Sequence, residues 1–182
     1  KTHAVYVQDK WQITPLWSLT LGARQEHYEA YDGVNQNTTL ARYEDRSRNT
    51  FSPKASLSFE PTPAWGFRAA FGKAYRFPTV TELFQQLTTS NNIIVTNNPN
   101  LKPEFIHNAE LNYNKQFEKG HQLMFSTYYQ YTENLIEKYR VFYSDGTSFT
   151  QPQNLNKGET FGAELTGKLQ FSKPWDATFN FN

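Results

Sequence analysis

Apolar and polar residues alternate with a period of two along much of this chain. In one stretch Leu19 and Leu21 alternate with Thr20 and Arg24, and the same pattern returns around Phe67. Successive side chains of a β-strand point to opposite faces, so the pattern predicts strands with one apolar and one polar face. It places eight strands at about 4–13, 17–28, 50–60, 65–74, 105–118, 121–131, 160–171 and 175–182.

Short and long connections alternate between the predicted strands. The short ones contain Pro or Gly, which favour tight turns, and lie at 14–16, 61–64, 119–120 and 172–174. The long ones are rich in Asn, Gln and Thr and run over 29–49, 75–104 and 132–159. Structureless loops of this length are unusual inside a compact soluble domain but normal on the outer side of a barrel. The organisation predicts an all-β fold of antiparallel strands.

Each tryptophan lies next to one of the predicted short turns. Trp11 and Trp17 flank the first turn, Trp65 follows the second, and Trp175 follows the last. Indole rings favour a membrane–water interface, because they are apolar and carry an N–H group. Outer-membrane β-barrels have such aromatic girdles. We therefore expect a transmembrane β-barrel whose odd-numbered apolar side chains contact outer-membrane lipid.

Charge and composition narrow the function further. Lys and Arg total 18 against 17 Asp and Glu, so a net charge of +1 gives no basis for binding nucleic acid. Cysteine is absent and the four His residues show no metal-ligand spacing, so neither a metal site nor a cofactor is predicted. No catalytic motif appears, so we predict a binding or transport protein and no enzyme activity.

Charged residues of the predicted strands gather at even-numbered positions, on the polar face. Lys73 and Lys115 are odd-numbered but lie near predicted strand ends, where a cation facing lipid costs little. Asp9 is odd-numbered within its strand. It is predicted to mark a bulge or an error in the register of that strand.

The strongest motif lies in the connection 75–104. It runs from Ala74 to Leu83 as AYRFPTVTEL and from Asn98 to Glu104 as NPNLKPE. This resembles the R-x-P, E-L and N-P-x-L-x-P-E signature of TonB-dependent outer-membrane receptors. Strands of that family are also similar to residues 7–11, 19–24, 51–54 and 162–165, in the same order. The resemblance covers nearly the whole chain.

The resemblance implies that residues 1–182 form part of a larger barrel domain, with eight of its about 22 strands. The parent protein would lie in the outer membrane of a Gram-negative bacterium and enclose a plug domain. It would take up a scarce nutrient with energy from the TonB–ExbB–ExbD complex, which acts through the plug. Neither the plug nor the TonB box is present in this segment, so the coupling is implied for the parent alone.

A ferric siderophore or another metal chelate is the expected ligand. Haem receptors of the family commonly carry an F-R-A-P motif, an N-P-N-L motif and a haem-ligating His between them. Residues 79–97 of this chain contain no His. A haem or cobalamin receptor is the alternative within the family. A passive porin-like channel and a soluble all-β binding or adhesion module are the alternatives outside it.

Candidate ligand-binding residues lie in the long connections. Those within the motif are Tyr75, Arg76, Glu82 and Asn100, and those in the connection 132–159 are Tyr139, Phe142 and Tyr143. The aromatic rings of the second group could stack on a planar chelate. Arg76 and Glu82 are also expected to brace the loop, through an ion pair or through hydrogen bonds.

Other motif residues are expected to shape the loop. The prolines limit φ, and Glu104 is expected to face the lumen or to support the loop backbone. The residues with this expected structural role are Pro78, Leu83, Pro99, Leu101, Pro103 and Glu104.

Overall fold

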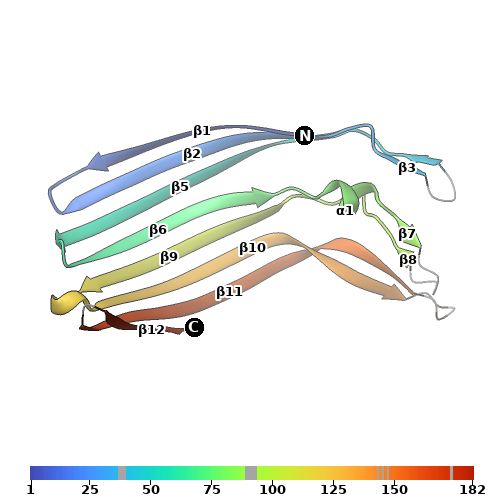
Figure 1. Ribbon diagram of the computed structural model, residues 1–182. Helices are drawn as coiled ribbons and strands as arrows, with labels where there is room; N and C mark the ends of the chain where they lie inside the picture. The colour runs from blue at the N-terminus through green and yellow to red at the C-terminus, as the bar shows by residue number, and fades with distance from the viewer. Residues whose placement is uncertain (37–39, 89–93, 143, 145, 147, 173) are drawn as a thin grey trace.

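The computed structural model describes residues 1–36, 40–88, 94–142, 144, 146, 148–172 and 174–182. Long antiparallel strands dominate it, each paired with the next one along the chain (Figure 1). They are β1 (Thr2–Gln12), β2 (Trp17–Ala30), β5 (Arg46–Thr62), β6 (Trp65–Arg76), β9 (Glu104–Gln116), β10 (Gln122–Phe142), β11 (Ser148–Ser172) and β12 (Trp175–Phe181). All eight predicted strands are confirmed. Among the described residues β1 does not pair with β12, so the sheet is open.

Smaller elements occupy parts of the predicted loops. β3 (Val34–Gln36) pairs with β4 (Leu40–Arg42), and the connection from β6 to β9 holds α1 (Val80–Phe84), β7 (Leu87–Thr88) and β8 (Ile94–Val95). The short turn after β9 is a 3-10 helix, η1 (Glu118–Gly120). No helix in the described part of the chain is long and apolar enough to cross a membrane.

The predicted loop over 132–159 is wrong for most of its length. β10 continues to Phe142 and β11 begins at Ser148, and their pairing runs without a change of register from Gln122 and Lys168 to the tip. The alternation of apolar and polar residues fades here. Main-chain hydrogen bonds hold the two strands together, and neither face has to be apolar beyond the band of hydrocarbon. The hairpin bends at Asn134, whose φ is 53°.

The register places the odd-numbered side chains of the long strands on one face, apart from two register shifts at the short-turn end, between Phe59 and Thr62 and between Gln170 and Ser172. Leu19 pairs with Leu57, Leu57 with Ala69, and Ala69 with Leu111. Large apolar side chains of this face are exposed, among them Leu57 and Phe71, while even-numbered polar residues are among the buried ones. The prediction of one apolar and one polar face is confirmed.

The predicted bulge or register error at Asp9 is wrong. Asp9 pairs with Leu21 within an uninterrupted antiparallel register, so its side chain lies on the apolar face. Its carboxylate accepts hydrogen bonds from the indole Nε1–H of Trp11 and from the main-chain N–H of Lys10, the latter at 2.8 Å. These two donors allow a carboxylate to stay on this face close to the short-turn end.

Aromatic rings line the apolar face at the short-turn end of the sheet. Trp17 lies 4.5 Å from Phe59, Phe59 lies 6.0 Å from Trp65, and Trp65 lies 5.7 Å from Phe67, measured between ring centroids. Trp11 pairs with Leu19 beside the first short turn, and Trp175 pairs with Ser172 beside the last one. These turns lie at the end of the sheet that is far from β3, β7 and β8 (Figure 1). Their location in a membrane interface stays a prediction.

Candidate functional site

The described parts of the connection from β6 to β9, residues 77–88 and 94–103, fold over the even-numbered face at the long-loop end of the sheet (Figure 1). We call this connection the signature segment. Its Leu83, Phe84 and Leu101 are buried with Ala30 of β2 and Ile136 of β10. This is the hydrophobic core of the described residues, and it lies at the long-loop end and not in the middle of the sheet. The signature segment is therefore a packed structure that lies against the wall formed by the long strands.

An arginine at the end of β6 connects three parts of this structure. The guanidinium of Arg76 donates to both carboxylate oxygens of Glu104, at 2.8 and 2.7 Å, and to Glu82 at 3.3 Å. The predicted ion pair between Arg76 and Glu82 is present. Glu104 is the more enclosed partner, with 6% of its side chain exposed. The planar fork of an arginine matches two carboxylate oxygens, so this contact also fixes orientation.

Glu104 also completes the main-chain pairing of β10. The pairing of β9 with β10 ends at Phe105 and Glu133, and β10 then continues beyond β9, paired on its other side with β11. The N–H of Ile136 donates to the Glu104 carboxylate at 2.6 Å, in place of a carbonyl of a neighbouring strand. A buried N–H without a partner would be costly, so Glu104 ties the overhanging part of β10 to the ion pair.

The charge on Glu104 follows from this setting. Burial alone would raise the pKa of the carboxyl group, but hydrogen bonds from Arg76 and from the Ile136 N–H, together with the Arg76 charge, lower its pKa below the usual value. Glu104 is therefore ionised at neutral pH and accepts hydrogen bonds from both sides.

The short helix α1 is fixed by its own N-terminus. The hydroxyl of Thr79 accepts from the N–H of Glu82 at 3.2 Å, and the Glu82 carboxylate accepts from the N–H of Thr79 at 2.8 Å. This reciprocal capping box explains why a five-residue helix forms at the sequence Thr-Val-Thr-Glu. Glu82 thus both caps α1 and binds Arg76, which couples the helix to the end of β6.

The N-P-N-L part of the signature segment makes main-chain contacts with two strands. The Asn98 side-chain amide donates to the carbonyl of Pro152 in β11 at 3.0 Å. Arg46 at the start of β5 donates to the carbonyls of Pro99 and Leu101, the latter at 3.2 Å. The motif therefore holds the segment between β5 and β11.

A second asparagine anchors the end of the segment. Asn154 of β11 accepts from the N–H of Lys102 at 2.8 Å and donates to the Lys102 carbonyl at 3.0 Å. It also donates to the carbonyl of Asn134, at the bend of β10, at 2.7 Å. Earlier in the signature segment, β8 pairs in parallel with β11 at Phe149 and Thr150. The signature segment therefore crosses beneath β10 and reaches the far edge of β11.

The predicted ligand residues occupy different surroundings. Asn100 is exposed on the signature segment. Tyr139 and Phe142 are exposed and lie in β10, where a loop was predicted, and Arg140 lies over the Phe142 ring at 5.4 Å from its centroid. Tyr143 lies outside the described residues. Whether any of them contacts a ligand stays a prediction.

Tyr75 is on the odd-numbered face, as the register partner of Phe105. Arg76, on the even-numbered face, lines a hollow of about 640 Å³ that lies between the end of β2 and the start of the signature segment. Tyr28 and Phe84 also line this hollow, and the Tyr28 hydroxyl donates to the carbonyl of Pro78 at 3.0 Å. The hollow opens beside the groups that brace the loop.

The predicted loop-shaping residues lie where they can act in that way. Leu83 and Leu101 are buried, with 1% and 3% of their surfaces exposed, and Pro78 is buried as well. Pro99 accepts a hydrogen bond from Arg46 through its carbonyl. Pro103 comes directly before Glu104, where β9 begins.

Sequence reasoning missed several residues that hold the segment. Arg46, Tyr28 and Asn154 contact it from β5, β2 and β11, although all are distant from it in sequence. Nothing in the local pattern distinguishes Asn154 from the other asparagines of its region. Their role depends on which strands the segment crosses, and this becomes visible only in the folded chain.

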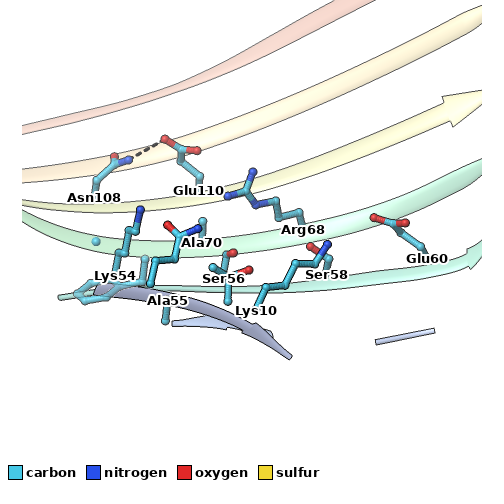
Figure 2. A pocket seen from close by; sticks show the side chains of 14 residues that line it. Lys10, Lys54, Ala55, Ser56, Ser58, Glu60, Arg68, Ala70, Asn108 and Glu110 are labelled. Atoms are coloured by element: carbon cyan, nitrogen blue, oxygen red, sulfur yellow. Dashed lines mark hydrogen bonds between the residues drawn. The ribbon is translucent and has the colours of Figure 1, made fainter. Parts of the chain in front are cut away.

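A second candidate site lies on the even-numbered face, further from the signature segment, in a hollow of about 520 Å³ lined by β1, β2, β5, β6 and β9 (Figure 2). Cations and anions alternate in it: Lys10, Lys54 and Arg68 share the wall with Glu60 and Glu110. Such a mixed surface can bind water, a polar solute or another polar protein surface. In the described part of the chain, no group of three or more His, Asp or Glu residues could hold a metal ion.

Comparison with known proteins places this geometry in a family. Residues 1–182 match the family model described as TonB dependent receptor-like, beta-barrel. The iron-regulated outer membrane virulence protein of Vibrio cholerae serotype O1 is 24% identical over 195 residues, which cover 93% of this chain and 25% of that protein. The chain therefore spans about a quarter of the length of this relative.

Solved structures show the same fold. The hemophore receptor HasR of Serratia marcescens has a TM-score of 0.75 at 18% identity, covering 92% of this chain and 31% of its own. The siderophore receptor PirA of Pseudomonas aeruginosa has a TM-score of 0.76 at 18% identity, and the match covers 98% of this chain and 33% of PirA. The copper transporter OprC has a TM-score of 0.76 at 19% identity, and the match covers 96% of this chain and 27% of OprC.

These matches confirm the resemblance found in the sequence and the barrel type of the fold. They also confirm the bacterial outer membrane as the location. The matched family consists of transport receptors. The number of strands in the whole barrel stays a prediction.

Proposed function

Because this chain belongs to the TonB-dependent receptor β-barrel family, we propose that it is part of a receptor that takes up a ferric siderophore or another metal chelate. Binding and passage are the whole of its action, with no bond made or broken. The wider receptor would draw energy from TonB–ExbB–ExbD through a plug domain outside these residues. The chelate would be captured at the long-loop end and would then pass along the polar face.

One observation carries this proposal: the signature segment is folded against the polar face at the long-loop end. Ion pairs, a capping box and a buried core hold it there. A binding site needs groups held in fixed positions, because ordering them at the moment of binding weakens affinity. A passive channel has no need of such a packed structure across its wall, so the geometry supports a receptor.

The ligand class is supported by the relatives and by the motif. The Vibrio cholerae relative is named as iron-regulated, and PirA is named as a siderophore receptor. HasR is a hemophore receptor, in complex with its hemophore and haem in the solved structure. The motif of this chain has no His within 79–97 that could ligate haem iron. We therefore favour a chelate whose own donor atoms saturate the metal.

Phe142, an exposed aromatic residue of the β10 overhang, is our proposed contact with the chelate. Its surface is 68% exposed on the even-numbered face, whereas Tyr139, with 55% exposed, lies on the odd-numbered face. Arg140 lies over the Phe142 ring and adds a positive charge beside it. Aromatic rings and cations together suit a flat, anionic chelate. Asn100 of the signature segment is a further proposed contact, whereas Tyr75 at the end of β6 lies on the odd-numbered face, away from the polar face along which the chelate would pass.

Growth of a strain that lacks the full-length gene tests the function. The strain is supplied with one iron source at a time, from a panel of ferric siderophores, haem and inorganic iron, and with cobalamin in a separate assay. We expect impaired growth on one chelate and normal growth on inorganic iron. Normal growth on every source would contradict the proposal.

Complementation tests the proposed contacts. The variant Phe142→Ala should bind the chelate about tenfold more weakly, since an exposed aromatic anchor often dominates binding. The matched control is Phe117→Ala, an exposed aromatic side chain at the opposite end of the sheet. Equal uptake by Phe142→Ala and the control would show that the chelate is recognised elsewhere.

A further inference from the structure

Lys73 is a cation on the face that carries the exposed apolar side chains. It lies in β6, and its ammonium group is 5.1 Å from the ring centroid of Tyr75 and 4.9 Å from that of Phe105. Lys73 takes part in none of the ion pairs found among the described residues. Two aromatic rings therefore hold the charge, and no carboxylate neutralises it.

His107 lies directly opposite Lys73 on the neighbouring strand. The two residues are register partners in β6 and β9, so their Cβ atoms are about 5 Å apart. The imidazole ring is surrounded by rings at 6.0 Å (Phe71), 5.7 Å (Phe105) and 6.4 Å (Tyr131). One ring nitrogen of a neutral imidazole carries a proton, so His107 supplies a hydrogen-bond donor beside the ammonium group.

The height of this pair on the wall follows from the strand geometry. Lys73 comes eight positions after Trp65, at the short-turn end, and three positions before the end of β6 at Arg76. At about 3.3 Å per residue and a tilt of about 40°, eight residues rise roughly 20 Å. The apolar band of an outer-membrane barrel is about 25 Å tall. Lys73 therefore lies near the outer boundary of hydrocarbon, at the level of lipid headgroups.

The nearby carboxylates on the odd-numbered face, Glu133 and Glu159, do not neutralise the charge of Lys73. Glu133 on β10 is the register partner of Phe105, and its carboxylate accepts a hydrogen bond from the Tyr131 hydroxyl. Glu159 on β11 is paired with Lys157 at 3.6 Å. A cation in a low-dielectric setting needs an anion, and a phosphate can accept hydrogen bonds from an ammonium group and an imidazole together.

We propose that Lys73 and His107, framed by Tyr75 and Phe105, bind a phosphate of a lipid A headgroup in the outer leaflet. The phosphate lies over Lys73 and His107, and the acyl chains follow the apolar side chains below, such as Phe71. This inference rests on the membrane orientation of the apolar face and is independent of the nutrient that the receptor transports. A failure of lipid binding would therefore leave the proposed uptake function untouched.

Native mass spectrometry of the full-length receptor in detergent tests the proposal, with bisphosphorylated lipid A as the probe. Lys73→Met removes the charge and keeps an apolar side chain suited to this face. It should weaken binding about fivefold, the factor expected for a single lysine at an anionic membrane surface. Lys73→Arg should bind as the unchanged receptor does. Lys115→Met is the matched control, because Lys115 lies over the Phe117 ring on the same face at the opposite rim.

A second measurement varies the lipid and leaves the protein unchanged. Lipid A without its phosphates should bind the receptor no more tightly than Lys73→Met binds the intact lipid. Equal binding of both forms of lipid A would overturn the proposal, as would an equal loss of binding in Lys115→Met. Equal, Lys73-dependent binding of phosphatidylglycerol would also overturn it, since the site would then accept any anionic lipid.

Discussion

The bond from the Ile136 N–H to Glu104 offers a direct test of how the signature segment is held. In Glu104→Gln the side chain keeps one carbonyl acceptor but loses its charge. Glu104 receives three hydrogen bonds, at 2.8, 2.7 and 2.6 Å, and two of them come from the cationic Arg76. Hydrogen bonds to charged groups contribute roughly 1.5–3 kcal/mol each.

The expected loss is smaller than the sum of these bonds. Arg76 has 39% of its side chain exposed and keeps Glu82 as a second partner, so water and Glu82 compensate for part of the change. We expect the free energy of local opening to fall by about 2 kcal/mol. This corresponds to roughly thirtyfold faster hydrogen exchange at the Ile136 amide.

Hydrogen exchange of the full-length receptor in detergent is the assay, because local opening is read there without global unfolding. Glu110→Gln is the matched control: Glu110 lies on the same strand and the same face, is exposed, and accepts only from the Asn108 side chain at 2.7 Å. Unchanged exchange at Ile136 in Glu104→Gln would refute the reasoning. Equally fast exchange in Glu110→Gln would do so as well, because the effect would then not depend on this contact.

Four further predictions follow from the same geometry. The pKa of Glu104 is lowered in the folded chain, so the stabilisation by its ionised carboxylate is complete above about pH 4.3, the ordinary pKa of a glutamate. That stabilisation is lost as the pH falls through the lowered pKa of the folded chain. Protection of the Ile136 amide from hydrogen exchange should therefore fall in that acid range, and Glu104→Gln should lack this pH dependence. Leu83→Ala removes a side chain that is 1% exposed and should destabilise the signature segment by about 2–5 kcal/mol. Limited proteolysis should then cleave the chain within residues 77–103, while the barrel keeps its resistance to unfolding in SDS. Thr79→Ala removes the cap of α1 at a cost of about 1 kcal/mol, so exchange at the Glu82 amide should quicken about fivefold, whereas Thr79→Ser should behave like the unchanged chain. Gly162→Ala places a Cβ 2.6 Å from the Tyr128 hydroxyl, so the free energy of unfolding should fall by about 1–3 kcal/mol. It should recover when Tyr128 is also replaced by a smaller residue. An unchanged melting temperature of Gly162→Ala in SDS would contradict this prediction.

The strands of this protein were largely predictable from local pattern. A strand with one face in hydrocarbon must alternate, so residues such as Leu19 and Leu21 reveal both the strand and its outward face. Where that requirement ends, the prediction fails. The extensions of β10 to Phe142 and of β11 back to Ser148 are held by main-chain bonds that any sequence can make, so they leave no pattern to detect.

The candidate site was likewise predictable from the sequence only in part. The sequence by itself determined that the segment around Arg76, Pro78 and Leu83 was a motif of this family, and that Arg76 would pair with Glu82 six residues away. Only the tertiary structure decided that Glu104 supplies the partner for the Ile136 N–H and that Asn154 anchors the end of the segment. The reason is distance along the chain: these contacts join residues 32 and 52 positions apart. They exist because the segment crosses particular strands, and that crossing is fixed by the sheet as a whole.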